Sequence, residues 1–163
     1  MVKKKGSTIE TINLSKRNSK KFNNIMKNGI AIVAFFMPGC GHCKDLKPTW
    51  NQLMRKYRKV RSSGPCMLSS VVTGNESLID SLDAQGITGF PTIRVFRNGK
   101  KWGRDYESDR SFDSLSNFID NQFGIVMSGG GKKYKKKLRT LKRKRRKRRR
   151  TRKKKRKLLF GLF

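Results

Sequence analysis

Apolar residues in the first 124 positions recur in two patterns that alternate along the chain. Short apolar runs, unbroken or alternating with polar residues, are typical of strands, whereas apolar residues three and four positions apart are typical of helices. The first pattern predicts strands over residues 8–14, 30–36, 66–73, 92–96 and 100–106. The second predicts helices through Phe22, Ile25 and Met26, from Cys40 through Leu46, Trp50, Leu53, Met54 and Tyr57, from Asn75 through Leu78, Ile79 and Leu82, and from Phe112 through Leu115, Phe118, Ile119 and Phe123.

The order of these elements predicts an α/β fold with a central mixed β-sheet flanked by helices. The run at 30–36 is short, continuous and rich in β-branched and aromatic residues, which favours a central strand covered on both faces. Asn98-Gly99 is a strong hairpin signal, so the last two strands should be antiparallel. Gly124 is suited to end the closing helix.

Positive charge is concentrated at the C-terminal end of the chain. Lys and Arg total 42 against 10 acidic residues, and residues 132–157 hold 21 of the basic residues and none of the acidic ones. So basic a tract cannot bury enough apolar surface to order itself, and we therefore expect a disordered tail. The predicted domains are an N-terminal extension with the first strand at 1–21, a core at 22–124, a Gly-rich linker at 125–131 and a basic tail with an apolar end at 132–163.

Cysteine number and apolar run length exclude two classes of protein. Three cysteines are too few for a secreted scaffold held by several disulfides. No apolar run approaches the roughly 20 residues of a spanning helix, so no transmembrane segment is expected. Lys3, Lys4 and Lys5 are followed by Gly, Ser and Thr rather than by an apolar stretch, so the sequence predicts no signal peptide and a location in the cytoplasm or nucleus.

The reactive chemistry is concentrated in Cys40-Gly-His-Cys43, at the predicted start of a helix. A helix N-terminus favours a thiolate, so Cys40 is the expected nucleophile. Cys43, one turn further on, can attack a mixed disulfide formed at Cys40 and release the substrate. His42, the single histidine, can stabilise the thiolate and make the Cys40–Cys43 disulfide a stronger oxidant. This redox-active disulfide needs no other cofactor.

Half of a zinc site is the alternative interpretation of two cysteines at this spacing, and zinc needs four ligands. The chain offers Cys40, His42, Cys43 and Cys66. Cys66 falls on a predicted strand beyond a long helix, so convergence of the four is improbable and no metal is expected. Cys66 is interpreted as a buried core thiol, with redox participation as the alternative.

The segment AFFMPGCGHCKDLKPTW, residues 34–50, resembles the active-site segment of the thioredoxin superfamily, in particular the catalytic domains of protein disulfide isomerases, in which CGHC is characteristic. Gly89-Phe-Pro-Thr92 is similar to that family's cis-proline loop. The resemblance covers residues 22–124 and implies a thioredoxin fold acting on protein thiols and disulfides. It further implies a cis bond at Pro91 beside Cys40, substrate contacts at Gly39, Gly41 and Phe90, and a helix-bending role for Pro48.

Two positions depart from the family pattern and one matches it. Gly39 stands where the family usually has Trp, so a substrate-contacting ring is missing. Ala34 stands where the family has a buried acid that accepts the proton of the second cysteine, which implies slow resolution by Cys43. Arg110 matches an arginine of the disulfide isomerases that lowers the pKa of the second cysteine; the alternative is a solvated surface arginine.

The basic tail is expected to bind a polyanion. Residues 132–157 fit non-specific binding to a nucleic-acid backbone or a nuclear import signal. Binding to an anionic membrane surface is the second interpretation, because residues 158–163 are apolar, and a merely solvated tail is the third. Such tails also resemble those on proteins of large DNA viruses, which adds a virion to the possible locations.

The sequence therefore supports two functions of different classes. The first is a thiol-disulfide oxidoreductase in which Cys40 attacks, Cys43 resolves, His42 tunes, Pro91 shapes the substrate groove and Arg110 assists. The second is a redox-impaired binding module, weakened at Ala34 and Gly39, whose purpose is served by the tail. The intact CGHC motif favours the enzyme.

Overall fold

The computed structural model describes residues 6–125; the predicted linker at 125–131, beyond its first residue, and the basic tail at 132–163 lie outside the described residues. The strands are β1 (Ser7–Thr8), β2 (Glu10–Asn13), β3 (Ile30–Phe36), β4 (Arg61–Ser62), β5 (Cys66–Val72), β6 (Thr92–Arg97) and β7 (Lys100–Lys101). The helices are α1 (Ser19–Asn28), α2 (Gly41–Tyr57) and α3 (Phe112–Phe123), with short 3₁₀ turns η1 (Glu76–Leu78) and η2 (Leu82–Ala84).

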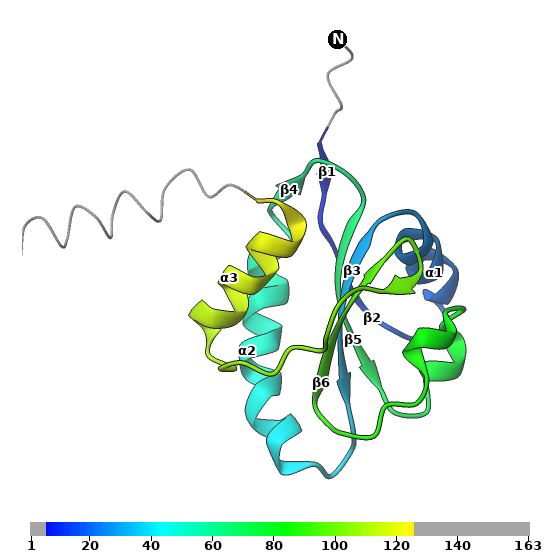
Figure 1. The fold of residues 1–163 in the computed structure, drawn as a ribbon, viewed down its shortest axis with the longest axis vertical. Helices are drawn as coiled ribbons and strands as arrows, with labels where there is room; N and C mark the ends of the chain where they lie inside the picture. The colour runs from blue at the N-terminus through cyan, green and yellow to red at the C-terminus, as the bar shows by residue number, and fades with distance from the viewer. Residues whose placement is uncertain (1–5, 126–163) are drawn as a thin grey trace, which may run out of the picture. The chain divides into compact units, whose positions relative to one another are not determined.

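A five-stranded mixed sheet in the order β2-β5-β3-β6-β7 forms the centre of the fold (Figure 1). Strands β2, β5 and β3 run parallel, whereas β6 and β7 are each antiparallel to their neighbour. β3 is flanked on both sides, and every residue after Ile30 in it is buried. The predicted central strand and antiparallel hairpin are thus confirmed, with Asn98 and Gly99 both at positive φ in the turn.

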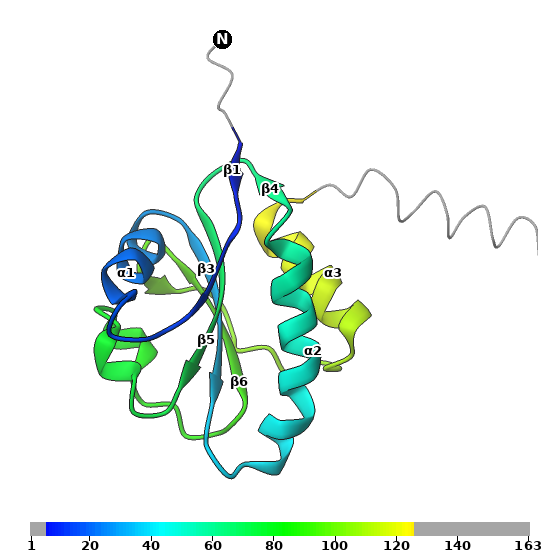
Figure 2. The same cartoon turned by 180° about the vertical axis from the view of Figure 1, so that it is seen from behind.

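Helices cover both faces of the sheet, as the two opposite views show (Figures 1 and 2). α1 packs against one face through Phe22 and Met26, together with Ile79 and Ala84 from the segment after β5. α2 and α3 pack against the other face. The alternation of β3 side chains explains the arrangement, because Ala31, Val33 and Phe35 enter the first core and Ile32, Ala34 and Phe36 the second.

Helix α2 follows the predicted periodicity and starts directly after Cys40. Its buried side chains are Cys43, Leu46, Trp50, Leu53, Met54 and Tyr57. Pro48 lies inside the helix. The helix buries one stripe of apolar side chains against the sheet, while most of the basic residues between them remain exposed.

The predicted helix after Asn75 is wrong. Residues 76–84 form only η1 and η2, Asn75 makes no side-chain cap, and Leu82 is 81% exposed. The Asn23 side chain of α1 donates to Leu78 O at 2.9 Å and accepts from Asp80 N at 3.3 Å. A side chain from another helix thus takes backbone groups that a continuous helix would pair internally.

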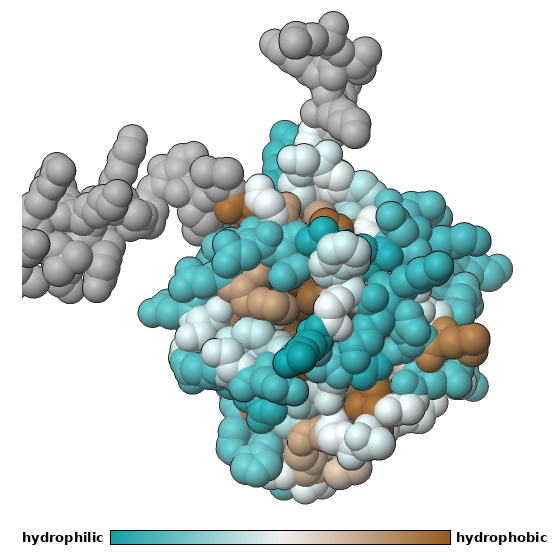
Figure 3. Space-filling view, viewed as in Figure 1, coloured by the Kyte–Doolittle hydropathy of each residue, from teal (hydrophilic) through white to brown (hydrophobic). Residues whose placement is uncertain are grey.

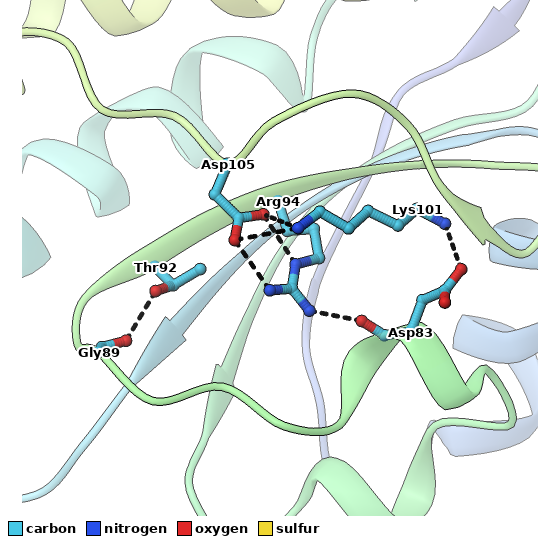
Figure 4. A network of polar contacts seen from close by, with 6 residues as sticks. All are labelled: Asp83, Gly89, Thr92, Arg94, Lys101 and Asp105. Atoms are coloured by element: carbon cyan, nitrogen blue, oxygen red, sulfur yellow. Dashed lines mark hydrogen bonds and ion pairs between the residues drawn. The ribbon is translucent and has the colours of Figure 1, made fainter.

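The predicted strand at 100–106 is also shorter than expected, because the ladder ends at Lys101. Gly103 has φ +71, a left-handed conformation that turns the chain out of the ladder. Beyond that point a polar network around the buried Arg94 side chain holds the segment (Figure 4). Arg94 donates two hydrogen bonds of 2.8 Å to the Asp105 carboxylate and a third to the backbone carbonyl of Asp83. Because Arg94 is on β6, this network ties the strand to both neighbouring loops.

The face shown in Figure 3 is mostly hydrophilic, and its apolar residues form small separate patches. Large apolar side chains that remain exposed between residues 6 and 125 are Met37, Val72, Leu82 and Trp102. None of the helices in this part of the chain combines the length and apolar character needed to cross a bilayer.

Candidate active site

Cys40 occupies the position between the end of β3 and the first turn of α2. It is the N-cap residue of α2, and the Cys43 backbone N–H donates to Cys40 Sγ at 3.2 Å. The first N–H groups of a helix have no partner within the helix, and they can donate hydrogen bonds to a sulfur anion. The helix dipole also places partial positive charge at this end, which favours such an anion. The structure therefore places Cys40 as the sequence predicts, in a setting suited to a nucleophilic sulfur.

A loop distant in sequence lies against the same sulfur. The Cys40 thiol donates to the Phe90 carbonyl, with Sγ 3.6 Å from the oxygen, and the Phe90–Pro91 peptide bond is cis. Thr92 Oγ1 donates to Gly89 O at 2.6 Å, which closes the loop just before β6. The cis bond beside Cys40 implied by the resemblance is confirmed, although the residues are 50 positions apart.

The two cysteines of the pair differ in access. Cys40 is half-buried, whereas Cys43 is only 4% exposed and belongs to the core under α2. Burial, and then the hydrogen bond with Cys40, raise the pKa of Cys43; the Met37 backbone and the positive charge of Arg110 act in the opposite direction. Cys40 is therefore the more accessible of the two sulfurs, and burial favours the neutral thiol form of Cys43.

Arg110 lies close enough to act on this pair. Its Nη2 donates to the carbonyl of Pro91 at 3.3 Å, and its charge lowers the pKa of Cys43. Neighbouring residues hold the backbone there: Tyr106 OH donates to Asp109 O, and the Asp109 carboxylate accepts from Ser111 and Ser114 at the start of α3. Sequence reasoning missed Tyr106 and Asp109; the capping pattern Asp-x-Ser-x-x-Ser ahead of the helix is the signal that could have found Asp109.

His42, Gly39 and Gly41 surround the cysteines at the surface. His42 and Gly41 are exposed in the first turn of α2. Gly39 has φ +80, and a side chain there would meet nothing within 4 Å, so the position before Cys40 is open. Met37, 43% exposed, is the nearest large apolar side chain in the preceding segment and was not singled out from the sequence.

Ala34 is fully buried in the core cluster that also holds Cys43. The buried polar or charged residues between 6 and 125 are Ser62, Ser69, Arg94 and Ser116, so no carboxylate in this part of the chain is buried beneath Cys43. Nothing there replaces the acid that the family pattern has at this position.

Cys66 lies at the opposite end of the sheet from Cys40. It pairs in register with Ile30, the first residue of β3, whereas Cys40 comes after the other end of that strand, separated from Phe36 by a short connection. Cys66 is buried, as predicted, and burial raises the pKa of its thiol. Between residues 6 and 125 no three His, Cys, Asp or Glu side chains gather in a metal-binding group.

A mixed sheet with this strand order, covered by helices on both faces and carrying a Cys-x-x-Cys pair at the N-terminus of α2 opposite a cis-proline, defines the thioredoxin fold. The family described as thioredoxin matches residues 13–121, and the chain belongs to that family.

Several relatives are disulfide isomerases by name. The chain is 31% identical over 133 residues to protein disulfide-isomerase 1 of Dictyostelium discoideum, covering 80% of this chain and 35% of that protein. It is 34% identical over 125 residues to protein disulfide-isomerase 2-3 of Arabidopsis thaliana, covering 76% of this chain and 26% of the relative. Among solved structures, the J-Trx1 fragment of ERdj5 matches with a TM-score of 0.52 and 26% identity, over 68% of this chain and 50% of that one.

The matched regions span about half or less of these proteins, so the chain corresponds to part of each. The comparisons confirm the fold and place the chain among thiol-disulfide oxidoreductases and their relatives. The CGHC assignment, the roles of the individual residues and the partner of the tail stay predictions.

Proposed function

We propose that this protein catalyses thiol-disulfide exchange on protein substrates through the dithiol of Cys40 and Cys43. The observation that carries the proposal is the placement of Cys40: its sulfur accepts from the first turn of α2 and lies 3.6 Å from the carbonyl before the cis-proline. An accessible sulfur at a helix N-terminus, backed by a buried second thiol, is suited to a two-step exchange.

In the reducing direction, the Cys40 thiolate attacks one sulfur of a substrate disulfide. The substrate S–S bond breaks, a mixed disulfide forms, and the released substrate sulfur takes a proton. Cys43 then loses its proton and attacks Cys40 Sγ, which breaks the mixed disulfide and releases the second substrate thiol. The substrate gains two electrons and two protons, and Cys40 and Cys43 become a disulfide. In the oxidising direction the same bonds form and break in reverse.

The surrounding residues take supporting roles in this proposal. His42 stabilises the Cys40 thiolate from the exposed first turn. Pro91 shapes the groove, and the backbone near Phe90 is offered to the substrate chain, with Gly39 and Gly41 leaving space at the opening. Arg110 acts on Cys43, since its charge lowers the pKa of that thiol.

Resolution by Cys43 is the slow step in this scheme. Burial raises the pKa of Cys43, and Ala34 supplies no group to take its proton. A long-lived mixed disulfide gives another substrate thiol time to attack it, which favours isomerisation of protein substrates over their rapid reduction.

The fraction of Cys40–Cys43 disulfide in a series of glutathione buffers, measured by alkylation and mass analysis, tests the proposal. A midpoint near about −180 mV supports oxidation and isomerisation, whereas one near about −270 mV makes the protein a reductase. A pair that does not exchange with glutathione contradicts the enzyme and leaves the redox-impaired binding module.

For the tail we propose a polyanionic partner, with nucleic acid favoured over an anionic membrane surface, and a location in the cytoplasm, the nucleus or a virion. The support is the sequence: 21 basic and no acidic residues between 132 and 157. Replacing residues 142–150 with Gln should weaken binding to a DNA duplex strongly and make it less dependent on salt. Unchanged binding would contradict this partner.

A further inference from the structure

The exposed side of α2 carries a stripe of four basic residues and one asparagine. Lys44, Lys47, Asn51, Arg55 and Arg58 follow each other at intervals of three and four residues, and all five are exposed. At 3.6 residues per turn they fall within an arc of about 80°, over a length of about 21 Å. We call these five residues the α2 stripe.

Strand β2 lies next to the α2 stripe, with Thr11 and Asn13 on the side of the sheet that α2 covers. Thr11 and Asn13 line a shallow groove together with Asn51, Met54, Arg55 and Arg58 of α2. Figure 2 shows β2 and α2 from this side. The polar side chains of β2 thus add donors and acceptors beside the two arginines.

The charges of the α2 stripe have no acidic partners in the described part of the chain. The ion pairs between residues 6 and 125 involve Lys21 with Glu10, and Arg94 and Lys101 with Asp105, none of them in the stripe. Arg55 Nε donates to Asn51 O at 3.3 Å, which lays that side chain along the helix. Four like charges on one helix side, unpaired and aligned, favour an external anion.

We propose that the α2 stripe binds the phosphate backbone of a nucleic-acid duplex. A duplex presents about 12 phosphates over about 21 Å of its axis, enough for every basic residue of the stripe. Arg, Lys, Asn and Thr are the side chains that contact phosphates and sugars without reading the base sequence. The folded domain would then bind the duplex through its own residues, independent of the tail.

A nucleic acid is favoured over an acidic protein because the stripe lacks an apolar anchor. A protein interface needs a desolvated centre of aromatic or aliphatic side chains. The exposed large apolar residues of the described chain, Met37, Val72, Leu82 and Trp102, are all outside the stripe, and Met54 beside it is buried. The stripe also has no aromatic ring on which a base could stack, which favours the backbone of a duplex.

Lysine modification of the unaltered full chain provides the first test. Acetylation is followed by mass analysis, with and without a short mixed-sequence DNA duplex. Lys44 and Lys47 should be modified several-fold more slowly with duplex, whereas Lys20 and Lys27, exposed on α1 at the opposite face, should change less. Equal slowing at all four lysines would overturn the proposal. Equal protection of Lys44 and Lys47 by polyglutamate would assign the stripe to an acidic protein and also overturn it.

Salt dependence of duplex binding provides the second test. The double variant Arg55→Gln/Arg58→Gln should reduce the slope of log Kobs against log salt by about 2, one for each phosphate that is no longer neutralised. The charge-matched control Arg17→Gln/Lys20→Gln, also exposed but on the α1 side, should leave the slope unchanged. Equal reductions in the two double variants would show that only net charge matters and would overturn the proposal. Thermal denaturation checks that both variants remain folded.

Discussion

Cys40 and Cys66 sit at opposite ends of β3, and the contrast between them shows how the position in the fold sets the surroundings of a thiol. Cys40 follows β3 at the N-terminus of α2, half-buried, with an N–H donor on its sulfur. Cys66 begins β5 beside the first residue of β3; burial raises the pKa of its thiol, and a hydrogen bond with the Ser62 side chain acts in the opposite direction. The side chain is the same; donors and access differ. We therefore expect the two thiols to differ in reactivity because of their positions in the fold.

The largest expected effect is on activity at Cys40. Cys40→Ser should abolish disulfide exchange, because a hydroxyl does not form a mixed disulfide. Turnover of a protein disulfide substrate measures it. The matched control is Cys66→Ala, which should keep turnover and lose about 1 kcal/mol of stability from the emptied core site. Comparable loss of turnover in both variants would break the contrast between the two ends of the sheet.

A stability effect without a redox effect is expected at Asp105. Asp105→Asn removes the charged partner of the nearly buried Arg94 side chain. The variant should lose about 2 kcal/mol of unfolding free energy, because a buried charge is left without its partner. Arg94, through its hydrogen bonds, lowers the pKa of Asp105. The pair therefore stabilises the fold above the unfolded Asp value of about 3.9, and the contribution is lost as pH falls through the lower folded value.

Urea denaturation of the parent and of Asp105→Asn at neutral and acid pH measures this difference. The gap in unfolding free energy should be largest near neutrality and shrink in strong acid. A difference in unfolding free energy that is constant across pH would contradict the role of the ion pair. A shifted redox midpoint of Asp105→Asn in glutathione buffers would contradict the prediction that Asp105 affects stability alone.

A smaller, step-specific effect is expected at Arg110. Removing its charge in Arg110→Gln should raise the pKa of Cys43 further, since that charge lowers it at present. Because the thiolate attacks, resolution speeds up as pH rises through the pKa of Cys43, and the variant should show that rise at higher pH. Single-turnover decay of a trapped mixed disulfide measures it, and Arg110→Lys should restore part of the profile. Identical pH profiles would return Arg110 to a solvated surface residue.

The smallest expected effect is at Leu82. Leu82→Ser should change the unfolding free energy by less than about 0.5 kcal/mol, because the side chain is 81% exposed. Ile79→Ser, which places a hydroxyl in the core beside α1, is the contrasting variant and should be clearly destabilising. Similar destabilisation at both positions, measured by denaturant titration, would restore the continuous helix predicted there from the sequence.

Most of the architecture could be predicted from local patterns. The run at 30–36, the periodicity of α2 and the Asn98-Gly99 turn each reflect a preference of the backbone itself, and the sheet and helices confirm them. The errors fall after Asn75 and after Lys101. In the first case the Asn23 side chain pairs backbone groups at 78 and 80, and in the second Gly103 and Asp105 take the chain out of the ladder. The first departure depends on a side chain distant in sequence, and the second on the left-handed conformation of Gly103 and on the contact between Asp105 and Arg94.

The candidate site divides in the same way. By itself the sequence determined that Cys40 and Cys43 lie one helical turn apart at the start of a helix, because the spacing and the preceding strand are local. Only the tertiary structure decided that Phe90 O lies 3.6 Å from the Cys40 sulfur, that Arg110 reaches Pro91 O, and that Cys43 is buried behind Cys40. The two hydrogen bonds join residues 50 and 19 positions apart in the sequence. They form because α2 and α3 pack against the same face of the sheet that contains β6.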